Sequence, residues 1–356
     1  MTRRGIKLSI LDQTPVLAEQ TAKEAFANTI ELAQLAERLG YYRFWVSEHH
    51  DSERVAGSSP EVLISHLLAK TERLRIGSGG VMLQHYSPYK VAENFNVLAS
   101  LAPGRVDLGV GRAPGGLPRS TRALQQGVTE PATLEGKLIE LQYYVANEVP
   151  ADHPLAGIVA GPVAAQPADI YVLGTSVASA EIAAASGLPY VFALFINSDE
   201  QVAHDAFQAY AERFQPKGGR TPEPILALSV IAADTDEEAA ELAGDYKLFK
   251  IKLASGRTLT VGTIEQAEEF GKQSNEEYSI DTQQAQIVKG TKETVRSRLL
   301  ELQEKFGVGE FIVVSTNVKN FEQRKHSYSL LKEAFDELLE EEKEEAAWEQ
   351  TAAARS

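Results

Sequence analysis

The sequence predicts a (β/α)8 barrel, or TIM barrel, with insertions at the carboxyl-end loops of its strands. Three observations lead to this fold class. Short apolar runs alternate with segments of helical periodicity, as in parallel sheets covered by helices. Eight such runs fit into 356 residues, and barrels of this kind span about 250 residues and can exceed 400 with insertions. The first run leads into Asp12-Gln13-Thr14-Pro15 rather than the glycine fingerprint expected of the rival fold, a doubly wound dinucleotide-binding sheet.

The expected strands are apolar runs bounded by glycine, proline or polar residues. They cover residues 7–11, 43–47, 74–78, 106–110, 169–173, 190–195, 225–232 and 310–315. Apolar residues at helical spacing, with glycine or proline near the ends, predict the helices. The helices cover residues 22–39, 60–70, 88–102, 133–145, 176–186, 199–214, 237–253, 291–306 and 320–339.

The surplus length is assigned to three insertions and a tail. The insertions are residues 111–132, 146–166 and 254–287, and the first begins with a long glycine- and proline-containing loop over 111–126. Loops of that size in compact domains commonly serve as lids or binding loops. We expect a single barrel domain over residues 1–339 and an acidic, solvated tail over 340–356, because the run from 337 to 349 is rich in glutamate.

The composition favours a cytoplasmic protein that acts on small molecules. A formal charge of -15 and a pI near 5.1 argue against nucleic acid or an anionic membrane as the partner, since both would repel such a protein. The chain has no cysteine, which excludes disulfides and thiolate chemistry. No apolar run approaches the roughly 20 residues that a membrane helix needs. Association into a homo-oligomer remains open.

Candidate acid–base residues follow the second and third strands. Glu48, His49 and His50 come directly after the second apolar run, and His85 follows the third, so all are expected at the carboxyl-end face where barrels place their chemistry. Neighbouring side chains at a strand end point in opposite directions, so only one histidine of the pair can face the barrel axis. A purely structural hydrogen-bonding pair is the alternative. No metal site is expected, because the spacing of zinc motifs is missing.

A candidate phosphate site combines Arg112 with the turn after the fifth strand. Arg112 follows the fourth strand among glycines, where a fixed guanidinium can meet a phosphate. Thr175, Ser176 and Ser179 accompany the free amides of a helix start, which together can bind an anion. The alternatives are an arginine paired with a loop acid and ordinary helix capping by the serines.

Jointly these motifs resemble the bacterial luciferase-like flavin monooxygenases. The resemblance lies in Phe-Trp-Val-Ser-Glu-His-His at 44–50, in residues 74–83 and 102–112, and in the turn after Leu173, in this order and spacing. It covers the chain from residue 7 to about residue 335. The resemblance implies a (β/α)8 barrel that binds reduced FMN, or in some branches a deazaflavin.

The resemblance also implies roles for single residues. His49 aligns with the flavin-facing histidine of the family, and Gly79–Gly80 matches a non-proline cis peptide bond near the flavin. The residues that match the phosphate site are Arg112, Gly174, Thr175, Ser176 and Ser179. Gly111 stands where light-emitting members carry a cysteine near the flavin, so the resemblance points to the wider oxidoreductase group rather than to light emission.

The expected function is therefore a flavin-dependent monooxygenase that uses reduced FMN and O2 to oxidise a small organic substrate, with His49 as the acid–base group. One alternative is a deazaflavin-dependent hydride-transfer enzyme, and another is a noncatalytic flavin-binding protein. No segment carries a nicotinamide dinucleotide fingerprint. We therefore expect the protein to receive reduced FMN from a separate NAD(P)H-dependent flavin reductase.

Overall fold

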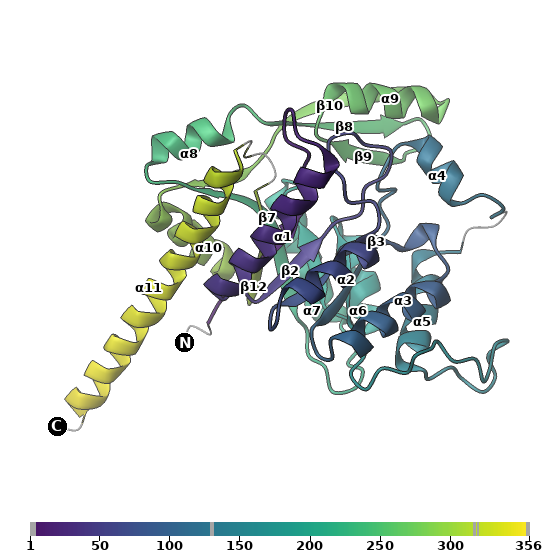
Figure 1. Ribbon diagram of the computed structural model, residues 1–356, viewed down its shortest axis with the longest axis horizontal. Helices are drawn as coiled ribbons and strands as arrows, with labels where there is room; N and C mark the ends of the chain where they lie inside the picture. The colour runs from purple at the N-terminus through teal and green to yellow at the C-terminus, as the bar shows by residue number, and fades with distance from the viewer. Residues whose placement is uncertain (1–4, 129–131, 316–317, 319, 354–356) are drawn as a thin grey trace.

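Eight parallel strands close into a barrel in the part of the chain that the computed structural model describes, residues 5–128, 132–315, 318 and 320–353. The strands are β1 (Lys7–Asp12), β2 (Arg43–Val46), β3 (Arg75–Met82), β4 (Val106–Gly111), β5 (Asp169–Gly174), β6 (Tyr190–Ala193), β7 (Pro224–Ala232) and β12 (Glu310–Val314). They pair in the order β12-β1-β2-β3-β4-β5-β6-β7, and β7 also pairs with β12 to complete the ring. The predicted (β/α)8 barrel is confirmed (Figure 1).

Helices cover the outside of the barrel. They are α1 (Ala22–Leu39), α2 (Pro60–Lys70), α3 (Pro88–Leu101), α5 (Leu134–Ala146), α6 (Val177–Ser186), α7 (Glu200–Arg213), α8 (Asp236–Ala243), α10 (Lys292–Phe306) and α11 (Phe321–Ala353). Their ends follow local sequence signals: α1 begins with a capping box between Thr21 and Glu24 and ends at Gly40, whose φ of 76° suits a residue without a Cβ. No helix within the described residues is long and apolar enough to cross a membrane.

Two apolar cores stabilise the barrel. The larger one lies between the strands and the helices and contains the outward-facing strand side chains, such as Phe44, Ile76 and Leu108. The smaller one fills the barrel interior and is formed by Leu11, Trp45, Tyr171, Val191, Ile225, Ala227, Ile312 and Val314. The strands therefore bury both faces, which explains why their sequences are continuous apolar runs.

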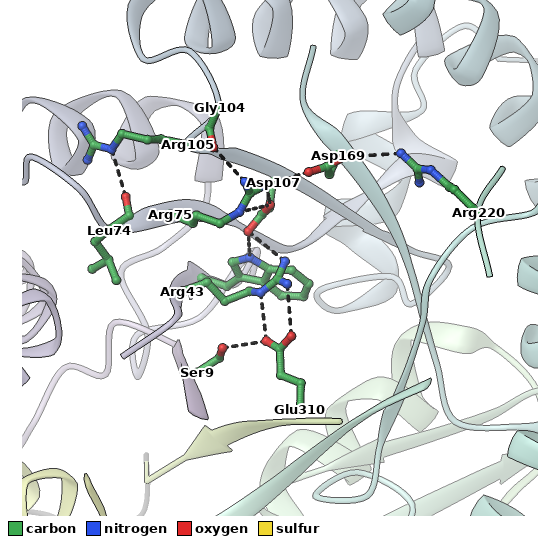
Figure 2. Close-up of polar contacts among 11 residues, drawn as sticks. Ser9, Arg43, Leu74, Arg75, Gly104, Arg105, Asp107, Asp169, Arg220 and Glu310 are labelled. Atoms are coloured by element: carbon green, nitrogen blue, oxygen red, sulfur yellow. Dashed lines mark hydrogen bonds and ion pairs between the residues drawn. The ribbon is translucent and has the colours of Figure 1, made fainter. Parts of the chain in front are cut away.

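Charged side chains close the amino-terminal end of the barrel (Figure 2). Arg43 at the start of β2 donates from Nη1 to Asp107 Oδ2 and from Nη2 to Glu310 Oε2, both at 3.0 Å. Arg43, Asp107 and Glu310 are each at most 2% exposed. Arg75 joins the network by donating to Asp107 and, at 2.8 Å, to Asp169. The network links the first residues of β2, β3, β5 and β12 to the second residue of β4, an arrangement that the sequence analysis does not predict.

The predicted helix over residues 237–253 is wrong in its second half. α8 ends before Gly244, and β8 (Lys247–Leu253) then pairs in antiparallel fashion with β9 (Thr258–Val261) and β10 (Tyr278–Gln284). Phe249, Ile251 and Leu253 contribute to one apolar cluster with α9 (Ile264–Ser274), whereas Lys252 between them is exposed. That alternation has the period of a strand. The insertion therefore begins near residue 244, ten residues earlier than predicted.

The other two insertions lie at opposite ends of the barrel. The loop predicted over 111–126 contains the short helix α4 (Pro118–Leu124), with proline at its first turn; residues 129–131 of this insertion are outside the described residues. The segment 147–166 joins α5 to β5 and therefore lies at the amino-terminal face. The last helix, α11, continues through the boundary predicted at 339/340 to Ala353 and extends away from the barrel (Figure 1).

Candidate active site

The carboxyl end of β2 places the predicted histidines at the barrel mouth. β2 is buried along its whole length, and Ser47 and Glu48 after it are buried as well. His49 Nδ1 lies 3.0 Å from Ser47 Oγ, whereas His50 Nε2 lies 2.7 Å from Glu48 Oε1. The two neighbouring histidines thus turn to different partners, as the alternation of side chains along an extended chain requires.

His49 combines a low pKa with an unused ring nitrogen. Burial lowers its pKa to about 4, and the nearby charge of His50 acts in the same direction, while Glu48 opposes both. Its Nε2 atom has no hydrogen-bond partner among the described residues. At neutral pH His49 is therefore an uncharged imidazole with one nitrogen available to a ligand.

His85, the other acid–base candidate, is held by protein on both sides. Its Nε2 donates to the carbonyl oxygen of Pro114 at 2.8 Å, and its Nδ1 accepts from Gln125 Nε2 at 3.1 Å. The side chain is buried, and burial lowers its pKa. Both nitrogens thus anchor the 111–126 segment to the end of β3. The geometry favours His49 over His85 as the group that meets a ligand.

Glu48, which the sequence places with the histidines at the end of the second strand, is a buried carboxylate. Its Oε2 accepts from the backbone amide of Met82 at 3.0 Å, and its Oε1 accepts from the Tyr86 hydroxyl at 2.8 Å. With His50 it has three donors in total, and only 1% of the residue is exposed. Burial next to this carboxylate raises the pKa of Tyr86. Glu48 therefore ties the end of β2 to the end of β3.

Arg112 lies at the barrel mouth beside the turn after β5. Val110 of β4 pairs with Val172 of β5, so Arg112 is level with Gly174 on a neighbouring strand, and such strands lie about 4.8 Å apart. The Arg112 side chain is exposed and forms no ion pair with any described residue. The alternative of an arginine paired with a loop acid is thus not what the structure shows.

Most hydroxyls of the predicted turn are used for helix capping. Ser176 and Ser179 form a capping box at the start of α6. The Ser179 hydroxyl also donates to the Ser176 carbonyl oxygen at 2.7 Å and lies 2.9 Å from the Tyr190 hydroxyl. The Thr175 hydroxyl, by contrast, has no partner among the described residues, and the amides of Val177 and Ala178 precede the first α-helical hydrogen bond. The Thr175 hydroxyl and these amides are therefore free to bind a ligand, whereas Ser179 stabilises the conformation of the turn.

Gly79 and Gly80 form the cis peptide bond that the family resemblance implies. A Cβ placed on Gly79 would lie 2.8 Å from Leu11 Cδ1, and one placed on Gly80 would lie 2.7 Å from the Gly109 carbonyl oxygen. Neither position has room for a side chain, so contact with a ligand at these residues would be made by backbone atoms.

These groups fit a flavin phosphate. Around the end of β4 and the start of α6 the free groups are a guanidinium, two helix-terminal amides and a hydroxyl, and all of them can donate hydrogen bonds to an anion. The described residues contain no group of three or more His, Asp and Glu side chains able to hold a metal ion. The chemistry of the donors around Arg112 and the turn suits a phosphate group.

The barrel mouth is covered by three segments that meet at Arg119. This residue of α4 donates from Nη2 to Asp51 Oδ1 at 2.9 Å, and its backbone amide donates to Gln273 Oε1 at 3.0 Å. Leu117 packs into the apolar cluster of the β8–β10 sheet and α9. In Figure 1 this sheet, α9 and α4 lie together at one end of the barrel. The loop after β2 and two insertions are thus joined over the site, where they can limit access of water.

Replacing Arg112 with alanine is expected to weaken FMN binding about tenfold to a hundredfold, because a charge-assisted hydrogen bond contributes about 1.5–3 kcal/mol. Quenching of flavin fluorescence during titration measures the affinity. Arg38→Ala is the matched control, since Arg38 is also exposed but lies in the last turn of α1. Equal FMN affinity in a folded Arg112→Ala protein and in the wild type would contradict the phosphate assignment.

Comparison with known proteins identifies the family of this chain. The sequence model of luciferase-like monooxygenase matches residues 6–310. The chain is 43% identical over 330 residues to N-acetyl-S-alkylcysteine monooxygenase of Bacillus subtilis (strain 168), which covers 92% of this chain and 98% of the relative.

Two solved structures have the same fold. The structure of apo-MsnO8 is 34% identical and superposes with a TM-score of 0.77 over 93% of this chain and 98% of its own. The oxygenating constituent of 3,6-diketocamphane monooxygenase from Pseudomonas putida, in complex with FMN, gives a TM-score of 0.68 at 17% identity over 93% of this chain and 98% of its own.

Proposed function

Because the chain belongs to the luciferase-like monooxygenase family, we propose that it is a flavin-dependent monooxygenase that uses reduced FMN and O2 to oxidise a small organic substrate. The observation that carries the proposal is the donor set formed by Arg112, Thr175 and the amides at the start of α6, which suits the phosphate of FMN. The FMN complex of a protein with the same fold supports the choice of cofactor. When bound, reduced FMN would supply the chemistry that activates O2.

The residues of this chain would bind, orient and protect the cofactor. Arg112 and the turn at 174–179 would hold the phosphate, and the backbone of Gly79–Gly80 would approach the flavin ring. His49 would hold or transfer a proton through its free Nε2. The segments joined at Arg119 would exclude water from the site, which favours transfer of oxygen to the substrate over loss to solvent.

The similarity to N-acetyl-S-alkylcysteine monooxygenase makes N-acetylated S-alkylcysteines the first substrates to test. A substrate of this class carries a carboxylate and a thioether. In a monooxygenation one atom of O2 enters the organic product and the other leaves as water.

The proposed function is tested by oxygen transfer from labelled O2. The purified protein with photoreduced FMN, mixed with ¹⁸O2 and N-acetyl-S-methylcysteine, is expected to yield an organic product with one ¹⁸O atom, detected by mass spectrometry. Fast reoxidation of protein-bound FMN without a labelled product would show that the protein reacts with O2 but does not oxidise N-acetyl-S-methylcysteine. Absence of an oxygen reaction, together with binding of a deazaflavin, would favour the hydride-transfer alternative.

The same assay tests the proposed partner, a separate NAD(P)H-dependent flavin reductase. With NADH or NADPH in place of light, the visible absorbance of FMN is expected to persist under anaerobic conditions until a reductase is added. The barrel mouth would already hold the flavin and the substrate, which leaves little room for a second nucleotide. Prompt bleaching by this chain alone would refute the two-component scheme.

A further inference from the structure

His50, the second histidine after β2, is paired with a buried carboxylate in a way that the proposed role of His49 does not use. Its Nε2 lies 2.7 Å from Glu48 Oε1. Glu48 already accepts from the Met82 amide and the Tyr86 hydroxyl, so we take Nε2 as the donor in this pair, and in the corresponding tautomer of the ring Nδ1 is left as an acceptor. This is the arrangement by which a carboxylate fixes the tautomer of a catalytic imidazole.

The free nitrogen of His50 lies on the open edge of its ring. A Cβ placed on Gly115 would lie 3.3 Å from His50 Cδ2, so the loop that follows β4 covers the Cδ2–Nε2 edge. Nδ1 lies on the opposite edge, has no partner among the described residues, and is not among the buried polar atoms that lack one. Nδ1 is therefore not fully buried, although only 11% of the His50 side chain is exposed.

The carboxylate that holds His50 is itself fixed. The Met82 amide donates to Oε2 of Glu48, and the Tyr86 hydroxyl donates to Oε1. Both donors come from the end of β3 and the turn after it, so the carboxylate cannot rotate away from His50 without losing two hydrogen bonds. A buried carboxylate with that many donors is well suited to stabilise a positive charge on the neighbouring imidazole.

Building on the proposed monooxygenase function, we propose that His50 is a second proton-transferring residue of the site and that Glu48 is its positioning residue. His50 would accept at Nδ1 one of the two protons that reduced FMN releases on oxidation and would return it to the oxygen atom that leaves as water, which restores the starting tautomer of its ring. Reduced FMN would supply two electrons and two protons, the substrate would gain one oxygen atom of O2, and the other would leave as water, so no further co-reactant is needed.

The other titratable groups around His50 are compatible with this role. Glu48 and the half-buried Glu61 of α2 provide negative charge, whereas His49 and His85 are neutral near pH 7 because their pKa values are lowered, chiefly by burial. The positions of His49 and His50 differ in their partners, since His49 Nδ1 lies 3.0 Å from Ser47 Oγ whereas His50 Nε2 lies 2.7 Å from Glu48 Oε1. Only His50 is therefore paired with a carboxylate.

The first test is the tautomer of His50, which needs neither turnover nor a variant. The chain has seven histidines, and proton–nitrogen correlation spectra of ¹⁵N-histidine-labelled protein distinguish the two neutral forms, with His50→Gln used for assignment. His153 is an internal standard, since its Nε2 lies 2.8 Å from Glu140 Oε1 and its Nδ1 accepts from Leu155 N. We expect His50 to carry its proton on Nε2, as His153 does, with and without FMN; a proton on Nδ1 would overturn the proposal.

The second test compares rates of flavin reoxidation by O2 in FMN-loaded variants. His50→Gln keeps a donor for Glu48 but removes the proton acceptor, and we expect the rate to fall about a hundredfold or more. Glu48→Gln should lower the rate and redistribute the His50 tautomers. Glu140→Gln, which alters the equivalent pair outside the site, should change neither.

The outcomes separate this inference from the proposed function. If the wild type binds FMN and reacts with O2 while His50→Gln keeps the wild-type rate, the Glu48–His50 pair is structural and the monooxygenase proposal stands. If the wild type does not bind FMN, the proposed function fails. The tautomer of His50 can still be measured in that case, because the measurement does not need FMN. A slowed His50→Gln protein that regains rate on addition of free imidazole would support the proposal directly.

Discussion

Replacing His49 with alanine is expected to slow reoxidation of the FMN-loaded protein by about a hundredfold to ten-thousandfold, the range that positioned acid–base groups contribute. His49 is the histidine whose Nε2 is free at the mouth of the barrel, while its Nδ1 is occupied by Ser47. Stopped-flow absorbance of the flavin after mixing with O2 measures the rate. FMN affinity should change little, because the proposed phosphate site is formed by other residues.

Two further variants show whether the effect belongs to His49. His66→Ala alters an exposed histidine on α2 and should leave the rate unchanged. His85→Ala removes the anchor of the 111–126 segment, so it should loosen the loop and mainly weaken FMN binding. A slow rate in His85→Ala, combined with a normal rate in His49→Ala, would mean that the roles of these histidines are reversed.

The pH of these comparisons matters because His49 also affects folding. Its pKa is about 4 in the folded protein against an ordinary value of 6.5, so the unfolded chain binds this proton more tightly. The free energy of unfolding therefore falls as the pH decreases from about 6.5 towards 4, and this contribution is fully present above 6.5. His85, whose pKa is also lowered, acts in the same direction. Rates should be compared above pH 6.5, where the fold is least affected.

Replacing Arg43 with methionine is expected to lower the free energy of unfolding by about 3–5 kcal/mol, since removal of one partner leaves the buried charges of the others uncompensated. Asp107 and Glu310 would lose their shared guanidinium at the amino-terminal end of the barrel. Asp107 would keep Arg75 and the Trp45 indole, whereas Glu310 would keep only the Ser9 hydroxyl. Urea unfolding followed by fluorescence measures the loss.

An exposed ion pair provides the control for Arg43→Met. Arg73 and Glu72 are 3.8 Å apart with side chains 75% and 86% exposed, and pairs of this kind contribute about 0–1 kcal/mol. Arg73→Ala should therefore leave the urea concentration at the midpoint of unfolding almost unchanged. If Arg43→Met is no more destabilising than Arg73→Ala, the network does not hold the barrel together.

Features that depend on local sequence were predicted correctly. Each barrel strand is a short apolar run, and residues such as Gly40 and Pro88 mark helix ends by conformational rules that act over a few positions. The placement of His49, His85 and Arg112 at one face follows from their positions directly after strands, because parallel strands of a barrel share one carboxyl end.

Features that depend on strand register were not predicted. Asp107 and Glu310 are separated from Arg43 by 64 and 267 residues, so their contact with Arg43 requires the register of the closed barrel. Charged residues inside otherwise apolar runs were the available signal, since such residues are rarely buried unless paired. The helix predicted over 237–253 failed for another reason: apolar residues in 248–253 fit a helical and a strand period over so short a run.

The junction at Arg119 has a consequence for how this enzyme could acquire a new specificity. Arg119 of α4 joins its own segment to two others, the loop after β2 through Asp51 and α9 through Gln273, and the three segments are remote in the chain and lie outside the barrel strands. A substitution in one segment can therefore break the hydrogen bonds that join it to the others at Arg119. To transfer these segments from one relative to another, all three would have to be exchanged together. They comprise Asp51, the segment around Leu117 and Arg119, and residues 244–286, and the barrel strands would stay unchanged.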